Sequence, residues 1–195
     1  MSNFRRPKHL TTRRMQETRP NPPKEQAKAQ RPAREIRWNC PVAAKCGGCQ
    51  LTRLSYAEQL QWKQQRVAEL LDGICEVRPI LGMDDPFHYR NKVHAVLAVD
   101  KAGRPISGVY AMGTHRVVPV RHCLIEDRRA DRIIQTIVAM LPAYKLRIYN
   151  EYTHRGFLRH ILIRTGHVTG QIMVVLVATS LEFPGKKAFV QELIQ

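Results

Sequence analysis

The sequence has 195 residues, of which 44% are hydrophobic, and its 32 Lys and Arg against 16 Asp and Glu give a formal net charge of +16. This length supports one sizeable core, and such a charge favours a polyanionic partner over the small protein partner of a redox carrier. The longest apolar run, residues 172–178, is far too short for a transmembrane helix, and the N-terminus has no secretory signal. We therefore expect a cytoplasmic, monomeric protein with no membrane attachment.

The first 37 residues are expected to form a disordered basic tail. They contain many Lys, Arg and Pro residues, only three Glu and very few apolar side chains. Such a segment cannot offset the entropy lost on ordering. Two interpretations stay open: an electrostatic arm for nucleic-acid phosphates, or a solubilising tail. An organelle transit peptide is a further alternative, although the prolines would interrupt its amphipathic helix.

Three of the five cysteines lie in one short stretch, NCPVAAKCGGCQ, where Cys40, Cys46 and Cys49 have the spacing C-x5-C-x2-C. Without a secretion signal, three neighbouring thiols indicate a metal centre rather than a disulfide framework. Gly47 and Gly48 allow the sharp turn that brings two sulfurs to one inorganic centre. The five-residue gap favours an iron–sulfur cluster, because paired zinc ligands are usually two to four residues apart. Zinc remains an alternative.

The elements that follow are predicted from periodicity and turn signals. Ser55 and Glu58 form a capping box that begins a helix ending near Gly73, and we expect this helix to pack beside the cysteine loop. Strand patterns follow over 78–81, 92–99, 106–112 and 114–120, with a turn at 100–104. A helix is predicted over 127–141, and strands over 145–149, 157–164 and 171–178. Side-chain alternation in 157–164 predicts that Leu158 and Ile161 face opposite sides of the sheet.

These elements predict an α+β fold, in which an antiparallel sheet is packed with helices and preceded by a Cys-rich loop. We expect a tail over 1–37, the cysteine loop and first helix over 38–75, and a central domain over 76–183. A last helix begins at Pro184-Gly185, and its apolar pattern continues to the final residue, as expected of a truncated helix over 184–195.

Two segments mix cations with aromatic rings, PFHYRNK over 86–92 and HRGFLRH over 154–160. Arg and Lys bind phosphates, and flat rings stack on unpaired bases. Arg90, Lys92, Arg155 and Arg159 are therefore candidate RNA-binding residues over the central sheet. The alternative is that they are ordinary solvated charges beside a sheet.

The cysteine stretch is followed by LTRLSYAEQLQWKQQRV and later by PFHYRNKV and GFLRHILIRTGHVTGQIMVVLV. Together these segments resemble the iron–sulfur class of RNA (uracil-C5) methyltransferases, from about Trp38 to Gln195. The resemblance implies a 4Fe–4S cluster on Cys40, Cys46, Cys49 and the downstream Cys123. Cys75 comes directly after the first helix and does not match a ligand position. We expect it to be a small buried hydrophobic residue.

The resemblance also implies the chemistry of the complete enzyme. Members of this family transfer a methyl group from S-adenosylmethionine to C5 of a uridine, and the resemblance favours ribosomal RNA over tRNA as the substrate. Their catalytic and cofactor-binding residues lie in a Rossmann-like domain after the matched region. The eleven glycines of this sequence include no G-x-G pair, which such a domain needs in its ligand-binding turn. We therefore expect that domain to be absent and the chain alone to be inactive. A stand-alone zinc- or cluster-containing RNA-binding protein is the alternative.

Overall fold

The computed structural model of the chain describes residues 36–195. The basic tail expected over residues 1–37 therefore lies outside the described residues, apart from its last two. Contacts divide the chain into two units, residues 1–32 and 33–195, and the second contains every described residue.

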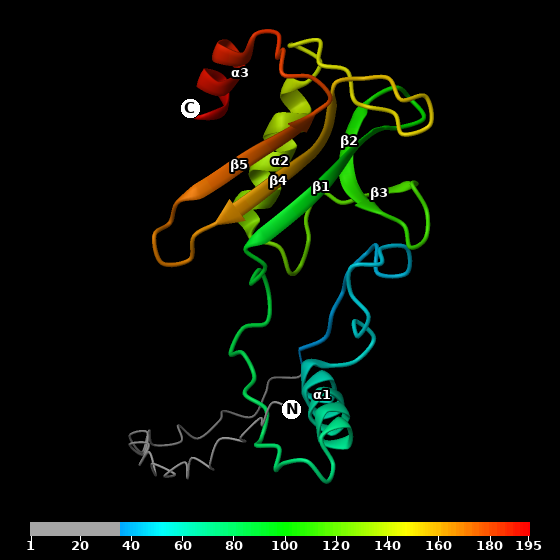
Figure 1. The fold of residues 1–195 in the computed structure, drawn as a ribbon, viewed down its shortest axis with the longest axis vertical. Coiled ribbons are helices and arrows are strands. Elements are labelled where there is room, and N and C mark those ends of the chain that lie inside the picture. The colour runs from blue at the N-terminus through cyan, green and yellow to red at the C-terminus, as the bar shows by residue number, and fades with distance from the viewer. Residues whose placement is uncertain (1–35) are drawn as a thin grey trace, which may run out of the picture. The chain divides into compact units, whose positions relative to one another are not determined.

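The described part is α+β, as the sequence predicts, with a five-stranded antiparallel sheet in the order β3-β2-β1-β4-β5 (Figure 1). Among residues 36–195, each helix is too short or too polar to cross a membrane. The elements in chain order are α1 (Tyr56–Leu70), β1 (Lys92–Val99), β2 (Pro105–Tyr110), β3 (Val117–Pro119), α2 (Arg128–Met140), β4 (Leu158–Thr165), β5 (Ile172–Ala178) and α3 (Lys186–Leu193).

Two of the predicted strands are wrong. Residues 78–81 form no strand: Leu81 is 87% exposed, and the Arg78 carbonyl accepts a hydrogen bond from the Gln64 side chain of α1. Residues 145–149 contribute only an isolated bridge at Ile148. Residues 78–81 have no neighbouring strand for their backbone groups. Residues 147–149 bond only to residues 157 and 158 at the start of β4, and periodicity alone does not predict how far such pairing extends. The last helix ends at Leu193, where the Ile194 N–H donates to the Val190 carbonyl.

The core lies between the sheet and α2, which covers one face of β1 and β4 (Figure 1). Phe189 of α3 is fully buried in the same core. A register irregularity between Leu158 and His160 places both Leu158 and Ile161 in this core, so the prediction that they face opposite sides is wrong. The extra residue of a β-bulge reverses the alternation that sequence reasoning extends along a strand.

The capping box of α1 is confirmed, because the Glu58 carboxylate accepts the Ser55 N–H at 2.6 Å while Ser55 Oγ accepts the Glu58 N–H. The helix packs on the segment that follows it: the Met83 N–H donates to Tyr56 Oη at 2.7 Å, and Leu60 lies against Gly82. Apolar side chains of its second half, Val67 and Leu70, stay exposed. Packing beside the cysteine loop was expected, but these contacts are made with residues 82–83.

Asp127 caps the N-terminus of α2 and should contribute measurably to stability. Its Oδ1 accepts the Arg129 N–H at 2.8 Å, and hydrogen bonds from Arg129 hold the pKa of Asp127 well below its ordinary value. We expect Asp127→Ala to lower the free energy of unfolding by about 1 kcal/mol at pH 7. Because the folded-state pKa is depressed, this contribution is complete above about pH 4 and is lost as the pH falls further.

Urea unfolding of the parent and of Asp127→Ala at pH 7 and pH 3 measures this contribution. Asp84→Ala, in an exposed segment, is the matched control and should unfold like the parent at both pH values. A deficit in Asp127→Ala that is as large at pH 3 as at pH 7 would contradict the electrostatic origin of the effect.

Candidate functional site

The cysteine stretch folds into consecutive turns between Cys40 and Cys49. The Cys46 N–H donates to the Val42 carbonyl at 2.8 Å, and the Gly48 N–H donates to Cys46 Sγ at 3.4 Å. Burial raises the pKa of Cys49, and negative charge at Cys46 and Cys40 raises it further. The charges of Cys46 and Cys40 thus act on the thiol of Cys49.

Cys123 lies between β3 and α2, and the charge of Glu126 acts on it as it does on Cys49. The Cys123 side chain is half-buried, and burial raises the pKa of its thiol to about 11. The backbone of Ile125 and Glu126 opposes this shift, while the Cys123 N–H donates to Asp131 Oδ2 at 2.9 Å. Negative charge on Glu126 raises the pKa of both Cys123 and Cys49. One carboxyl group therefore lies near the downstream cysteine and the cysteine turn.

Glu126 belongs to a pair of carboxyl groups at this junction. Burial raises its pKa to about 7, and the charge of Asp131 adds to the effect. Arg90 opposes the shift, and the same guanidinium lowers the pKa of Cys49. Arg90 is exposed, but its charge already acts on the cysteine turn and a carboxylate. The charge of this predicted RNA-binding residue thus acts on Cys49 and Glu126.

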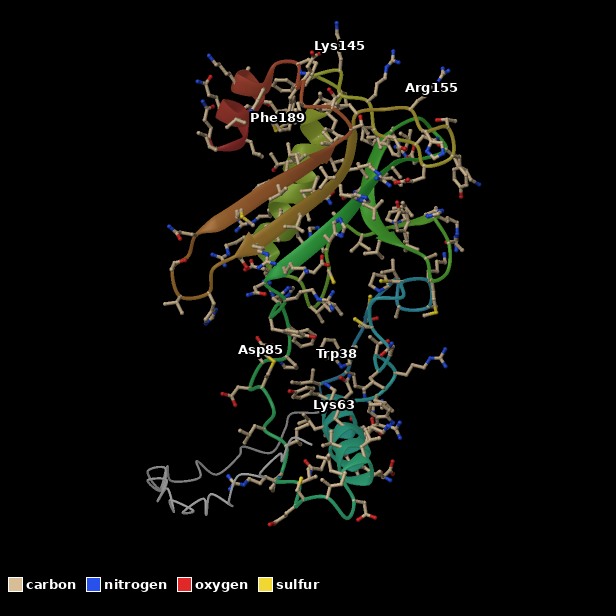
Figure 2. All side chains as sticks on the ribbon, in the orientation of Figure 1. Trp38, Lys63, Asp85, Lys145, Arg155 and Phe189 are labelled. Carbon is tan, nitrogen blue, oxygen red and sulfur yellow. The ribbon has the colours of Figure 1, made fainter. Side chains whose placement is uncertain are left out.

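Trp38 provides an unpartnered donor close in sequence to the cysteines. Its ring packs against Phe87 with centroids 4.8 Å apart, on the segment leading into the cysteine turn (Figure 2). Its Nε1–H is buried and has no hydrogen-bond partner among the described residues. Leaving such a donor unpaired costs about 1–3 kcal/mol, so an acceptor is expected nearby.

One observation limits the metal-site interpretation, and a second corrects the expectation for Cys75. Within residues 36–195, no three His, Cys, Asp or Glu side chains are arranged to hold one metal ion together. Cys75 is exposed, so the expectation that it is buried is wrong. The reason is local: the chain leaves α1 at Leu71 and runs through exposed turns, away from the core.

The other candidate cations occupy different ends of the sheet. Lys92 pairs with Arg164 across β1 and β4, and Arg164 pairs in turn with Met173 of β5, in a row on the face opposite α2. Lys92, Arg164, Asn91 and Gln171 line a cavity of about 620 Å³. Arg164 adds a cation to the predicted set. The periodicity of the sequence places Arg164 on a strand, but it does not identify Lys92 as its cross-strand partner.

Arg159 lies toward the opposite end of β4, about 17 Å along the strand from Arg164 at ~3.3 Å per residue, and Arg155 lies in the loop before β4. Arg155 is exposed and projects outward from its loop (Figure 2). Arg159 donates from Nε and Nη2 to the Glu151 carboxylate, each at 2.8 Å, and lies 4.9 Å from the centroid of the Tyr149 ring. The four predicted residues therefore form no single cluster, and Arg159 already has a carboxylate partner.

Sequence reasoning missed a group of rings beside Arg159. Tyr110 and His115 meet edge to face at 5.5 Å, and His115 meets Tyr152 in the same way at 6.4 Å between centroids. We name Tyr110, His115 and Tyr152 the aromatic ladder. Its members come from the end of β2, the following turn and the 149–156 loop. Their spacing in the sequence gives no sign of this contact.

Comparison with known proteins gives these features a context. No family model matches the chain. A protein of Clostridium tetani, named as an uncharacterized RNA methyltransferase, is 40% identical over 167 residues, and one of Bacillus cereus with the same name is 38% identical over 159. The chain is similar to RNA methyltransferases. These matches cover 84% and 79% of the chain but 36% and 34% of the relatives. The chain thus spans about a third of their length.

The fold is also similar to a solved enzyme, the tRNA (uracil-54, C5)-methyltransferase of Pyrococcus abyssi in complex with S-adenosyl-L-homocysteine. The TM-score is 0.58 with 26% sequence identity, over 77% of this chain and 35% of that one. The sequence comparison and the fold comparison therefore both find RNA methyltransferases similar to this chain.

Proposed function

We propose that this chain is the cluster-binding and RNA-binding part of an S-adenosylmethionine-dependent RNA (uracil-C5) methyltransferase. The observation that carries the proposal is the 40% identity over 167 residues with a protein named as an RNA methyltransferase. The fold neighbour, a tRNA uracil-C5 methyltransferase bound to S-adenosyl-L-homocysteine, supports the reaction and the methyl donor. Ribosomal RNA is the proposed substrate, from the resemblance of the cysteine motif. The 195 residues by themselves bind RNA without methylating it.

The proposed ligands of a 4Fe–4S cluster are Cys40, Cys46, Cys49 and Cys123. The donor set supports this assignment, because three of the thiols lie within electrostatic range and Glu126 acts on both the turn and Cys123. The lack of a single-ion site among the described residues is compatible with a cluster, whose four thiolates each bind a different iron. The unpaired Trp38 N–H would find an acceptor in anionic sulfur. Once bound, the cluster would tie the cysteine turn to the segment between β3 and α2.

The proposed RNA-binding residues differ in how available their charge is. Lys92 and Arg155 are exposed, and Lys92 has a second cation, Arg164, directly across the strand pair. Arg90 and Arg159 remain in the proposal, but each already acts on a carboxylate, Glu126 and Glu151 respectively. Phosphate binding therefore depends most on the Lys92 and Arg164 row. The described residues also carry 22 Lys and Arg against 13 Asp and Glu, a balance that suits a polyanion.

The test compares two double variants that each remove two exposed cations. Lys92→Ala/Arg164→Ala alters the β1–β4 row, and Lys186→Ala/Lys187→Ala alters α3 as the matched control. Binding of a ribosomal stem-loop and of a tRNA is followed by fluorescence anisotropy at several salt concentrations. We expect the first variant to reduce the slope of log K against log salt by about 0.7–0.9 for each phosphate that is no longer bound. Equal slopes in the two variants would show that these cations are only solvated surface.

A further inference from the structure

The aromatic ladder is supported by hydrogen bonds at the Tyr110 hydroxyl and at the Tyr152 backbone. Glu151 accepts hydrogen bonds from Arg159 at 2.8 Å and from Tyr110 Oη at 3.4 Å. Asn150 Oδ1 accepts the Tyr152 N–H at 2.9 Å, which fixes the loop that presents this ring. The rings are therefore positioned before any ligand arrives, so binding carries little further entropy cost for ordering them.

The ladder stays accessible despite this support. Tyr152 is 77% exposed, and His115 is also exposed. Edge-to-face contacts leave ring faces free, so a further flat group can stack on the ladder. Packing of the core does not explain why the backbone of Tyr152 is held in place while its ring is open to solvent.

A cavity of about 580 Å³ adjoins the ladder. Tyr110 and His115 line it together with the turn between β2 and β3, and Gly47 and Gly48 of the cysteine turn complete the lining. The two glycines expose backbone without a side chain, which leaves room beside the rings. The volume falls within the range of about 300–1,000 Å³ that is typical of small-molecule sites. A single nucleobase fits within such a volume.

The charges around the cavity favour a polyanion. None of the described residues that line it is acidic, and the nearest carboxylate in the network, Glu151, is paired with Arg159. Exposed cations lie next to the lining in sequence: Lys45 precedes the Gly47 turn, and Arg116 follows His115. Stacking rings flanked by Lys and Arg are the mixture that binds unpaired nucleotides.

We infer that the aromatic ladder and its cavity form a binding site for one unpaired nucleobase of the RNA substrate, with Tyr152 and His115 as the stacking rings. The inference rests on the proposed function, since it assumes that the chain binds RNA. It adds a base-binding site to the phosphate contacts, on a surface separate from the Lys92 and Arg164 row. The site is tolerant of sequence, because each base offers a face for stacking.

The test measures binding of a stem-loop RNA to the full chain and to its Tyr152→Ala, His115→Ala and Tyr152→Phe variants. Removing one stacking ring should weaken binding by about tenfold in the alanine variants, whereas Tyr152→Phe retains the ring and should bind like the parent. Trp62→Ala is the matched aromatic control, since Trp62 is 49% exposed on α1 and lies outside the ladder. The slope of log K against log salt should stay unchanged in Tyr152→Ala, because every cation that binds a phosphate is still present.

A second readout uses RNA with 2-aminopurine at each unpaired loop position in turn. At one position the fluorescence should be quenched on binding to the parent and not on binding to Tyr152→Ala. Equal affinity of the parent and of the Tyr152→Ala/His115→Ala variant, with the same quenching, would overturn the base site but leave the proposed function intact. A parent chain that binds no RNA would overturn both.

Discussion

Replacing Cys123 by serine should remove the iron from protein purified without oxygen, whereas Cys75→Ser should keep about four iron and four sulfide per chain. Cys123 is half-buried, its N–H is held by Asp131, and the charge of Glu126 acts on its thiol and on that of Cys49. Cys75 is exposed on the loop after α1. The pair of variants thus removes the same atom from a proposed ligand position and from an exposed one, and iron and acid-labile sulfide are measured in both.

The two possible failures of this prediction have different meanings. Stoichiometric zinc without labile sulfide in the parent would show that the cysteines bind zinc and not a cluster, which is the alternative that the cysteine spacing leaves open. Iron retained equally in both variants would keep the cluster but exclude Cys123 as a ligand. Since the thiols of Cys40, Cys46 and Cys49 already lie within electrostatic range, the fourth position is the critical one.

Local signals predicted the elements whose pattern depends on neighbours in sequence. The capping box at Ser55, the strand at 92–99 and the amphipathic helix at 128–140 were located to within a residue or two. Each of these signals is contained within a few turns of chain. The predictions failed where a partner decides the outcome, as in residues 78–81, which have no neighbouring strand, and at Leu158, where a bulge changes the direction of the side chains.

The same distinction between local signals and tertiary partners applies to the candidate site. The charges of Cys40 and Cys46 act on Cys49, an effect that the short spacing in the sequence makes possible. The ion pair between Arg159 and Glu151, the row of Lys92 and Arg164, and the aromatic ladder all depend on strand register or loop geometry. The sequence predicted cations in two segments, but only the pairing of side chains in the fold separates available charges from those that already have a carboxylate partner.

Gly156→Ala should lower the free energy of unfolding by about 3–5 kcal/mol. Gly156 has φ +124, a conformation that side chains rarely adopt, and an added Cβ would overlap the Ile148 carbonyl oxygen and the Tyr149 Cα. Because these are backbone atoms, a rotamer change cannot relieve the overlap. The loop that carries Tyr152 must move or the end of β4 must shift.

Gly103→Ala is the matched control, since Gly103 also has a positive φ, +78, but a Cβ there would meet nothing within 4 Å. That variant should show only the left-handed strain, about 1–2 kcal/mol. Urea unfolding of both variants separates strain from overlap, and RNA binding under native conditions then reports on the loop. Equal destabilisation by the two substitutions would mean that the loop relaxes around Gly156 at little cost. The fixed position of Tyr152 would then no longer support the base site.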